Sequence, residues 1–368
     1  MKQDPLQKII QVAVKRGASD LHIKAGDVFR ARIDGKLVPL TKQRLTPDQT
    51  RAIALMLIPH EEDRRRIDHL KDYDCSWGMP GVGRFRVNLL RQRSSFMIVM
   101  RVIPFAVPSL ESLAVPEVLA TVVEQPHGFI AISGSSGSGR SSTMAAMIHH
   151  LNSTAEKHIV SIENPIEFLH RDLKSSVTQR DVGIDTASVN AGLRSAVRQD
   201  PDVIVIGDIR DGDTAETAIK AAEMGHLVIG VLSAPNVPST LSRLLSMFPS
   251  EDRDMARTRL ADVLIGVSAQ HLVPRKSGDG RLAVFEVLVA TDAVRNWLRT
   301  HGTLLELQEL MTADDEESGM CTFDSEIARL RDEEMITAQT AEAFSAQQHA
   351  PPKKSSRRAK TRSRKSSS

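Results

Sequence analysis

The sequence predicts an α/β protein in which a phosphate-binding loop follows a strand of a parallel sheet, and a smaller α+β domain comes first. A Gly/Ser-rich segment, residues 134–142, stands between an apolar strand-like segment and a helical pattern. Short apolar segments then alternate with helical patterns, as in parallel sheets covered on both faces. The length of 368 residues is enough for two domains with separate cores.

The first domain is predicted to span residues 1–103. It begins with an amphipathic helical pattern, and Asp34-Gly35 between apolar-containing flanks is a hairpin signal. A further helix is expected from Pro47, because proline is favoured in the first turn of a helix. Residues 83–104 have the apolar pattern of two more strands.

Residues 104–112 are predicted to form an interdomain linker rich in proline, and residues 113–345 the second domain. Helices are expected from Arg140, Ala187 and Thr214. From about residue 249 onward the pattern predicts mainly helix, with one strand at 281–290. The strands expected before that point are residues 128–133, 158–163, 202–207 and 227–233.

Composition places the chain among ordinary globular proteins. Apolar residues make up 41% and charged residues 26%, and no apolar run reaches the roughly 18 residues that a membrane span requires. The N-terminus lacks the pattern of a signal peptide, so a cytoplasmic location is expected. Cys75 and Cys321 are far apart, which indicates neither a disulfide framework nor a zinc site.

The C-terminal residues 346–368 are predicted to be a disordered basic tail. Residues 351–368 hold eight Lys and Arg and no acid, so the other residues carry a net charge of −6 within the overall +2. This tail has no apolar pattern to bury, and it is expected to contact acidic surfaces or to act only as a solubilising extension. Nothing in it reads bases, so no specific nucleic acid is expected as a partner.

Residues 134–142 are the predicted nucleotide-binding loop. They fit the pattern G-x-x-x-x-G-K-[ST] except that arginine replaces lysine. Glycines allow successive backbone N–H groups to converge on a phosphate, and the following helix N-terminus favours negative charge. Ser141 stands where a hydroxyl would bind Mg²⁺; the alternative is a Gly/Ser-rich turn without a ligand. The predicted binding residues are Gly134, Ser135, Ser136, Gly137, Ser138, Gly139, Arg140, Ser141 and Ser142.

Several motifs in the same order make the chain resemble the PilT/PilU branch of the secretion-type ATPases from about residue 4 to 345. Such collinearity is far more specific than a single glycine-rich loop. Besides that loop, the motifs are GASDLHIKAG (17–26), GVGRFRVN (81–88), SIENPIEFLH (161–170), VTQRDVGIDT (177–186), LRSAVRQDPDVIVIGDIRD (193–211), AAEMGHLVIGVLS (221–233), QHLVP (270–274) and GMCTFDSEI (319–327).

This resemblance implies a PAS-like N-terminal domain joined to a RecA-like P-loop ATPase domain. It further implies a hexameric ring that binds ATP and Mg²⁺ between subunits. The ring would lie at the inner-membrane base of a type IV pilus, contact a platform protein there, and drive pilin disassembly for pilus retraction and twitching motility.

The resemblance also implies catalytic roles for Glu163, Asp208 and His226, with Glu163 assisting Ser141 at Mg²⁺. Four positions depart from the family pattern: lysine is replaced by Arg140, aspartate by Asn164, glutamate by Asp208, and a second histidine by Ser233. Guanidinium differs from ammonium in shape, and aspartate is one methylene shorter than glutamate. Because positioning supplies much of phosphoryl-transfer catalysis, weakened hydrolysis is expected.

Arg84, Arg86, Arg101 and Arg180 are candidates for a contact made in trans to a neighbouring subunit's nucleotide. An arginine from a neighbour stabilises the charge that develops on the transferred phosphoryl group. The alternative for these side chains is a set of ordinary salt bridges.

Two functions remain open on this basis. The first is a retraction ATPase subunit with weakened hydrolysis, in a homo-hexamer. The second is a non-catalytic accessory subunit in a mixed hexamer with an active paralogue. An extension-type assembly ATPase is disfavoured, because the sequence lacks a tetracysteine zinc motif and its N-terminal region is short.

Overall fold

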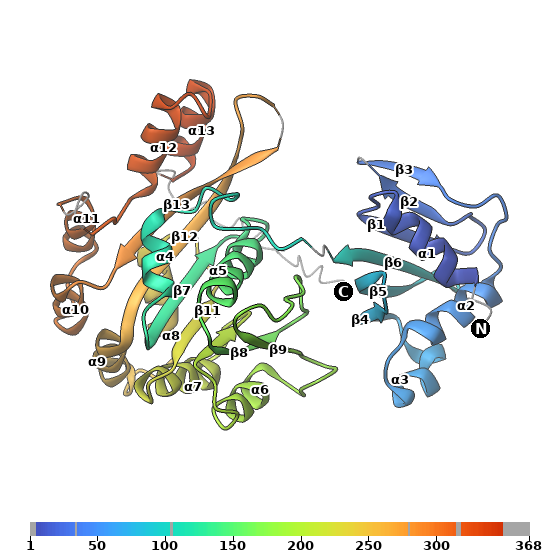
Figure 1. Cartoon of the computed structure of the whole chain (residues 1–368), viewed down its shortest axis with the longest axis horizontal. Helices are drawn as coiled ribbons and strands as arrows, with labels where there is room; N and C mark the ends of the chain where they lie inside the picture. Colours follow the sequence, from blue (N-terminus) through green and yellow to red (C-terminus); the bar gives the residue numbers. More distant parts are fainter. Residues whose placement is uncertain (1–4, 34, 104–105, 279, 314–317, 349–368) are drawn as a thin grey trace, which may run out of the picture.

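The computed structural model describes residues 5–33, 35–103, 106–278, 280–313 and 318–348, which form two lobes along the longest axis of the molecule (Figure 1). Each lobe is built on one sheet, of six strands in the N-terminal lobe and seven in the C-terminal lobe. The predicted tail is thus outside the described residues apart from its first three positions. Among the described residues no helix is long and apolar enough to cross a membrane.

The N-terminal sheet is antiparallel, with strand order β3-β2-β1-β6-β5-β4. The two strands predicted within 83–104 are confirmed as β5 and β6, and the strands flanking the expected hairpin pair as β2 and β3, although Asp34 itself is outside the described residues. The strands are β1 (Asp20–Lys24), β2 (Arg30–Ile33), β3 (Lys36–Pro39), β4 (Asp72–Met79), β5 (Gly83–Gln92) and β6 (Ser95–Ile103).

Helices α1 (Pro5–Lys15) and α2 (Pro47–Leu57) bury apolar residues in the core of this lobe. The predicted helix start at Pro47 is confirmed, because Thr46 caps the helix reciprocally with Gln49. Short helical turns, α3 (Glu61–Arg65) and η1 (Ile67–His69), lead into β4, a strand that the sequence reading missed.

The C-terminal sheet has strand order β13-β12-β7-β11-β10-β8-β9, and every neighbouring pair is parallel except β12 with β13. The predicted parallel sheet is therefore confirmed. The strands are β7 (Gly128–Gly134), β8 (His158–Glu163), β9 (Ser176–Asp181), β10 (Val203–Ile206), β11 (Leu227–Val231), β12 (Leu264–Pro274) and β13 (Arg281–Val289).

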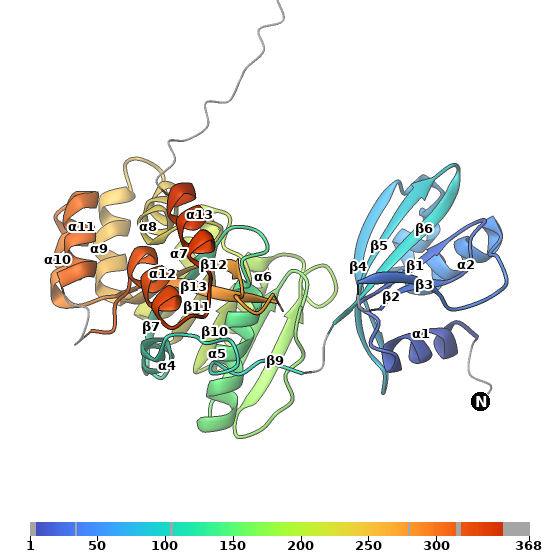
Figure 2. The ribbon, with the colours of Figure 1, turned by 90° about the horizontal axis from the view of Figure 1, so that it is seen from above.

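Helices cover both faces of this sheet (Figure 2). Ile130 and Ile132 of β7 face a core with α4 and α5, whereas Phe129 and Ala131 face a core with the helices of the opposite side. The helices are α4 (Glu117–Val123), α5 (Arg140–Thr154), α6 (Val189–Ala196), α7 (Gly212–Glu223), α8 (Val237–Ser246), α9 (Arg253–Val263), α10 (Asp292–Arg299), α11 (Leu304–Ala313), α12 (Phe323–Asp332) and α13 (Ala338–Gln348).

The expectation of a single strand beyond residue 249 was wrong, because β12 (Leu264–Pro274) lies between β7 and β13. Its largely apolar run lacks the alternation of a half-buried strand, so periodicity alone does not separate it from a buried helix. The edge strand β9 was missed for the opposite reason, since its sequence SVTQRD is mainly polar.

Glu286 of β13 gives the C-terminal lobe a pH-dependent stability. Its carboxylate accepts a 2.6 Å hydrogen bond from the backbone N–H of Val237, and burial raises its pKa from 4.5 to about 7. As pH rises, the Glu286 carboxyl therefore ionises at a lower pH in the unfolded chain than in the folded chain. The free energy of unfolding consequently falls between about pH 4.5 and about pH 7.

The predicted loss from this group is up to about 3 kcal/mol. The variant Glu286→Gln would keep an acceptor for the Val237 N–H and remove the titration. Chemical denaturation between pH 5 and about 8 should therefore give a flatter stability profile for the variant. Parallel profiles for the two proteins would contradict this assignment.

Candidate nucleotide-binding site

The phosphate loop lies between the C-terminal end of β7 and the N-terminus of α5. Gly137 and Gly139 have φ of +79° and +95°, a region that L side chains rarely adopt. Gly139 precedes the first residue of α5, so the free N–H groups of the first helical turn face the loop. The structure therefore builds the arrangement that binds a phosphate through backbone donors and a helix dipole.

Gly134 cannot be replaced without moving the loop. A Cβ on Gly134 would lie 2.3 Å from Ser138 Oγ and 2.6 Å from the backbone carbonyl oxygen of Gln270. Its φ of +148° adds backbone strain for any other residue. The close approach of β7, the loop and β12 at this point explains the glycine that begins the motif.

The serines of the loop differ in exposure. Ser135 and Ser136 are exposed, Ser138 is buried, and Ser141 and Ser142 are half-buried in the first turn of α5. Ser141 has no side-chain hydrogen bond among the described residues, which leaves its hydroxyl available to a ligand. No cluster of three or more metal-binding side chains exists in the described parts of the chain, so a magnesium ion here would need phosphate oxygens and water among its ligands.

The side chain of Arg140 is hydrogen-bonded to the two residues that follow β11, Leu232 and Ser233. Its Nη1 donates to the Leu232 carbonyl oxygen and to Ser233 Oγ, both at 2.6 Å. Burial lowers the pKa of the guanidinium, and the nearby carboxylates of Asp208 and Glu167 act in the opposite sense. Two of the four divergent positions, 140 and 233, are therefore in direct contact.

Asp208 follows β10 at the same edge of the sheet. Its Oδ2 accepts a 2.5 Å hydrogen bond from Nε of Arg210, in an ion pair whose arginine is largely exposed. The carboxylate predicted to activate water is thus beside Arg140 and engaged by a second cation. An attacking water would therefore have to share this carboxylate oxygen with Arg210.

Glu163 ends β8 and is buried, with 3% of its surface exposed. Its Oε1 accepts hydrogen bonds from Ser161 Oγ at 2.8 Å and Gln179 Nε2 at 3.0 Å. Burial raises the pKa of Glu163 despite these two donors. The next residue, Asn164, is exposed, so the divergent amide lies at the surface of the site.

The structure does not bring His226 to this site. It directly precedes β11, and Leu227 pairs with Gly128 at the edge where the parallel strands begin, whereas the phosphate loop leaves the edge where they end. Its Nδ1 donates to the Pro201 carbonyl oxygen at 2.8 Å. The expected catalytic role of His226 is therefore not supported, and its position suits a structural role.

Three of the four candidate trans-acting arginines already have partners within the chain. Arg84 forms a 2.5 Å ion pair with buried Asp181, which joins β5 of the first lobe to β9 of the second. Arg101 pairs with Asp20 at 2.9 Å. Arg180 Nη2 donates to the Asp185 carbonyl oxygen at 2.8 Å.

Arg86 differs from the other three candidates. Among the described residues it has no ion pair, and it lines a cavity of about 80 Å³ between the lobes together with Asn164 and Asp181. Arg86 on β5 pairs with Arg101 on β6, which adds positive charge to this surface of the sheet. Arg86 is therefore the candidate that could contact an outside anion without first leaving an ion pair.

Gln270 is a residue of the site that the sequence alone did not indicate, apart from its place in the QHLVP motif. It lies on β12 beside Gly134, and its Nε2 donates to the Ser138 carbonyl oxygen at 2.9 Å. Its strand was read as helical, so the sequence offered no reason to place it under the phosphate loop.

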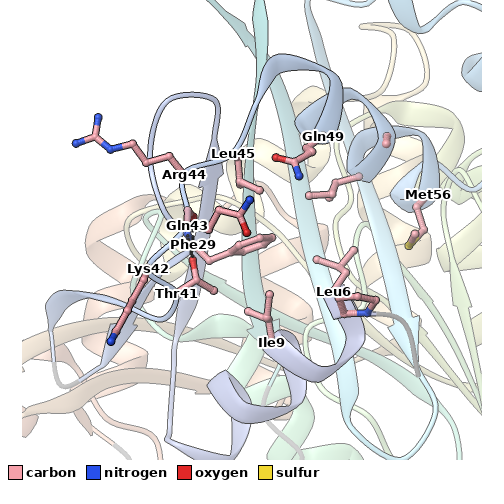
Figure 3. Close-up of a pocket in the computed structure, with 13 residues that line it drawn as sticks. Leu6, Ile9, Phe29, Thr41, Lys42, Gln43, Arg44, Leu45, Gln49 and Met56 are labelled. Carbon is pink, nitrogen blue, oxygen red and sulfur yellow. Dashed lines mark hydrogen bonds between the residues drawn. The ribbon is translucent and has the colours of Figure 1, made fainter. Parts of the chain in front are cut away.

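A separate apolar cavity of about 590 Å³ opens between α1, α2 and the segment 41–45 of the N-terminal lobe. Figure 3 shows Phe29 and Leu45 facing this cavity, with Lys42 and Arg44 directed outward. It has no glycine-rich loop or carboxylate, so it lacks the groups that bind a nucleotide and Mg²⁺.

Residues 2–325 match the family described as "Type II/IV secretion system protein". The chain belongs to this family. Within the Type II/IV secretion system protein family, it is 39% identical over 294 residues to the type IV pilus retraction ATPase PilT of Pseudomonas aeruginosa, a match that covers 80% of this chain and 85% of that protein.

The type IV pilus ATPase PilU of the same organism is 38% identical over 337 residues, covering 91% of this chain and 87% of that protein. A crystal structure of the pilus retraction motor PilT with bound ADP is 36% identical in sequence. It superposes with a TM-score of 0.83 over 93% of this chain and 97% of that chain. The predicted family and the two-part α/β fold are therefore confirmed.

Proposed function

We propose that this chain is a subunit of a type IV pilus retraction motor that binds ATP with Mg²⁺ at residues 134–142 and hydrolyses it slowly. The phosphate loop supports nucleotide binding, and the relative and the solved structure that are named for pilus retraction support the motor role. The observation that supports slow hydrolysis is the hydrogen bonding of Arg140 to Leu232 and Ser233, because it directs the guanidinium to these two residues.

The binding groups have distinct proposed roles. The backbone of Gly134–Gly139 and the N-terminus of α5 would bind the phosphates, with the Ser141 hydroxyl and the Glu163 carboxylate at Mg²⁺. The ion would neutralise the charge of the phosphate oxygens. Asp208 would orient or deprotonate the attacking water, and Arg210 would compete for the same carboxylate.

The same proposal includes a hexameric ring at the cytoplasmic face of the inner membrane, in contact with the pilus platform protein. Nucleotide would lie between subunits, where a neighbour could supply Arg86 to its phosphates. Arg84 would enter such a contact only after release from Asp181, because their ion pair lies within one subunit.

A second candidate is a non-catalytic accessory subunit in a mixed ring with an active paralogue. The engagement of both Arg140 and Asp208 by neighbouring groups favours it, since these are the positions where phosphoryl-transfer chemistry needs a lysine and a free carboxylate.

Deletion and complementation in the source organism test the motor role. If the chain serves retraction, its deletion should reduce twitching and increase the number of surface pili, and the unmodified gene should restore both. A strain that also lacks the paralogue distinguishes a motor built from this chain alone from an accessory subunit. In that strain this chain should restore twitching only if it forms a motor by itself. Unchanged piliation and twitching after deletion would refute a retraction role.

A further inference from the structure

Gln270 occupies a buried position directly beneath the phosphate loop. It is 1% exposed and lies opposite Gly134 in the parallel pairing of β12 with β7. Its side-chain amide donates to the Ser138 carbonyl oxygen at 2.9 Å, across 132 residues of sequence. A residue outside the glycine-rich motif is thus bonded to the backbone of the loop.

The contacts of Gln270 reach both ends of the loop. Its backbone carbonyl oxygen is within 2.6 Å of where a Cβ on Gly134 would lie, and its Nε2 within 3.1 Å of the corresponding point on Gly139. A side chain at Gly134 or Gly139 would therefore approach atoms of Gln270 too closely, and the absence of a Cβ at both positions makes space for Gln270. Gln270 therefore lies against the loop at its first residue, Gly134, and at Ser138 and Gly139 beside the start of α5.

Two buried polar atoms at this contact have no hydrogen-bond partner in the described chain, Gln270 Oε1 and Ser138 Oγ. A buried polar atom without a partner is costly, so such atoms require an explanation in a native protein. Here both atoms lie at the contact between Gln270 and the loop that would hold a phosphate, so this contact has only the one side-chain hydrogen bond, from Gln270 Nε2 to the Ser138 carbonyl oxygen.

We propose that Gln270 is a positioning residue that holds the phosphate loop in its binding shape before nucleotide arrives. This inference rests on the proposed nucleotide-binding function and specifies how it is achieved. Because Arg140 is hydrogen-bonded to Leu232 and Ser233, the backbone N–H groups supply the phosphate contacts. The convergence of these N–H groups depends on the Ser138 carbonyl being held by Gln270. Preorganisation of this kind raises affinity by reducing the ordering cost of binding.

The test compares Gln270→Leu, which removes the donor, with Gln270→Glu, which keeps the length. Ser268→Ala is the matched control, because Ser268 is buried on the same strand and its hydroxyl also has no partner. We expect Gln270→Leu to weaken ADP binding about tenfold, the equivalent of one hydrogen bond, while Ser268→Ala leaves it unchanged.

The pH dependence of ADP binding by Gln270→Glu distinguishes a hydrogen-bonding role of Gln270 from a role in packing alone. An ionised carboxylate cannot donate to Ser138, whereas the protonated acid can. ADP affinity of Gln270→Glu should therefore rise toward that of the unmodified chain as pH falls, and the affinity of Gln270→Leu should not. Wild-type affinity of both variants at neutral pH would overturn the proposal.

Hydrogen exchange of the ligand-free proteins separates this inference from the proposed function. In Gln270→Leu, residues 134–139 should exchange about tenfold faster than in the unmodified chain, with Ser268→Ala unchanged. If the unmodified chain binds no ADP, the proposed function fails and this exchange result alone decides the role of Gln270. Equal exchange in Gln270→Leu and the unmodified chain would overturn that role.

Discussion

The variant that combines Arg140→Lys, Asn164→Asp, Asp208→Glu and Ser233→His is expected to hydrolyse ATP about 100-fold faster than the unmodified chain. Each change restores a group that binds phosphate or activates water, and a single preorganised group of this kind changes kcat by about 100-fold or more. The Arg140→Lys change would also remove the guanidinium from Leu232 and Ser233. Steady-state phosphate release at saturating Mg-ATP measures the effect.

The control for this experiment carries Arg331→Lys with Asp332→Glu, changes of the same chemical type at an exposed ion pair on α12. It should retain the rate of the unmodified chain. If the combined variant binds ATP normally yet turns over no faster, the four replaced positions do not limit hydrolysis, and the slow step lies elsewhere.

Gly134→Ala is expected to abolish detectable nucleotide binding and to destabilise the C-terminal lobe by about 2–4 kcal/mol. The new Cβ would collide with Ser138 Oγ and the Gln270 backbone carbonyl, and the positive φ adds strain. Both effects displace the loop from the backbone geometry that binds phosphate. Equilibrium ADP titration and chemical denaturation of the same preparation measure the two quantities.

Gly225→Ala is the control that separates the effect of backbone strain from that of the steric collision at Gly134. Gly225 has a φ of +96° but no atom within 4 Å of its added Cβ, and it lies at the edge of the sheet away from the loop. This variant should lose about 1 kcal/mol of stability and retain ADP binding. Equal losses of binding in the two variants would show that the collision at Gly134 is not responsible.

The sequence was sufficient for the parts of the fold that depend on local pattern. The apolar segment before Gly134 and the spacing of its glycines predict a strand, a loop and a helix from Arg140, as observed. Parallel pairing follows from the alternation of buried strands with helices. These features need no knowledge of distant contacts.

Other features depend on contacts between residues far apart in the chain, and no local pattern reveals them. The strand β12 has an apolar run that suits either helix or strand, so Gln270 was not placed beneath the loop. The direction of Arg140 depends on its acceptors at the end of β11. His226 was misplaced because a motif gives residue order and does not say which end of a strand faces the ligand.

The most direct test is a single-turnover experiment in which the unmodified chain, in excess over Mg-ATP, is followed for both nucleotide binding and phosphate release. The account predicts saturable binding, with phosphate release about 100-fold slower than in the combined variant. Rapid phosphate release by the unmodified chain would contradict the inhibitory role given to Arg140 and Ser233. Absence of binding would contradict the nucleotide site itself.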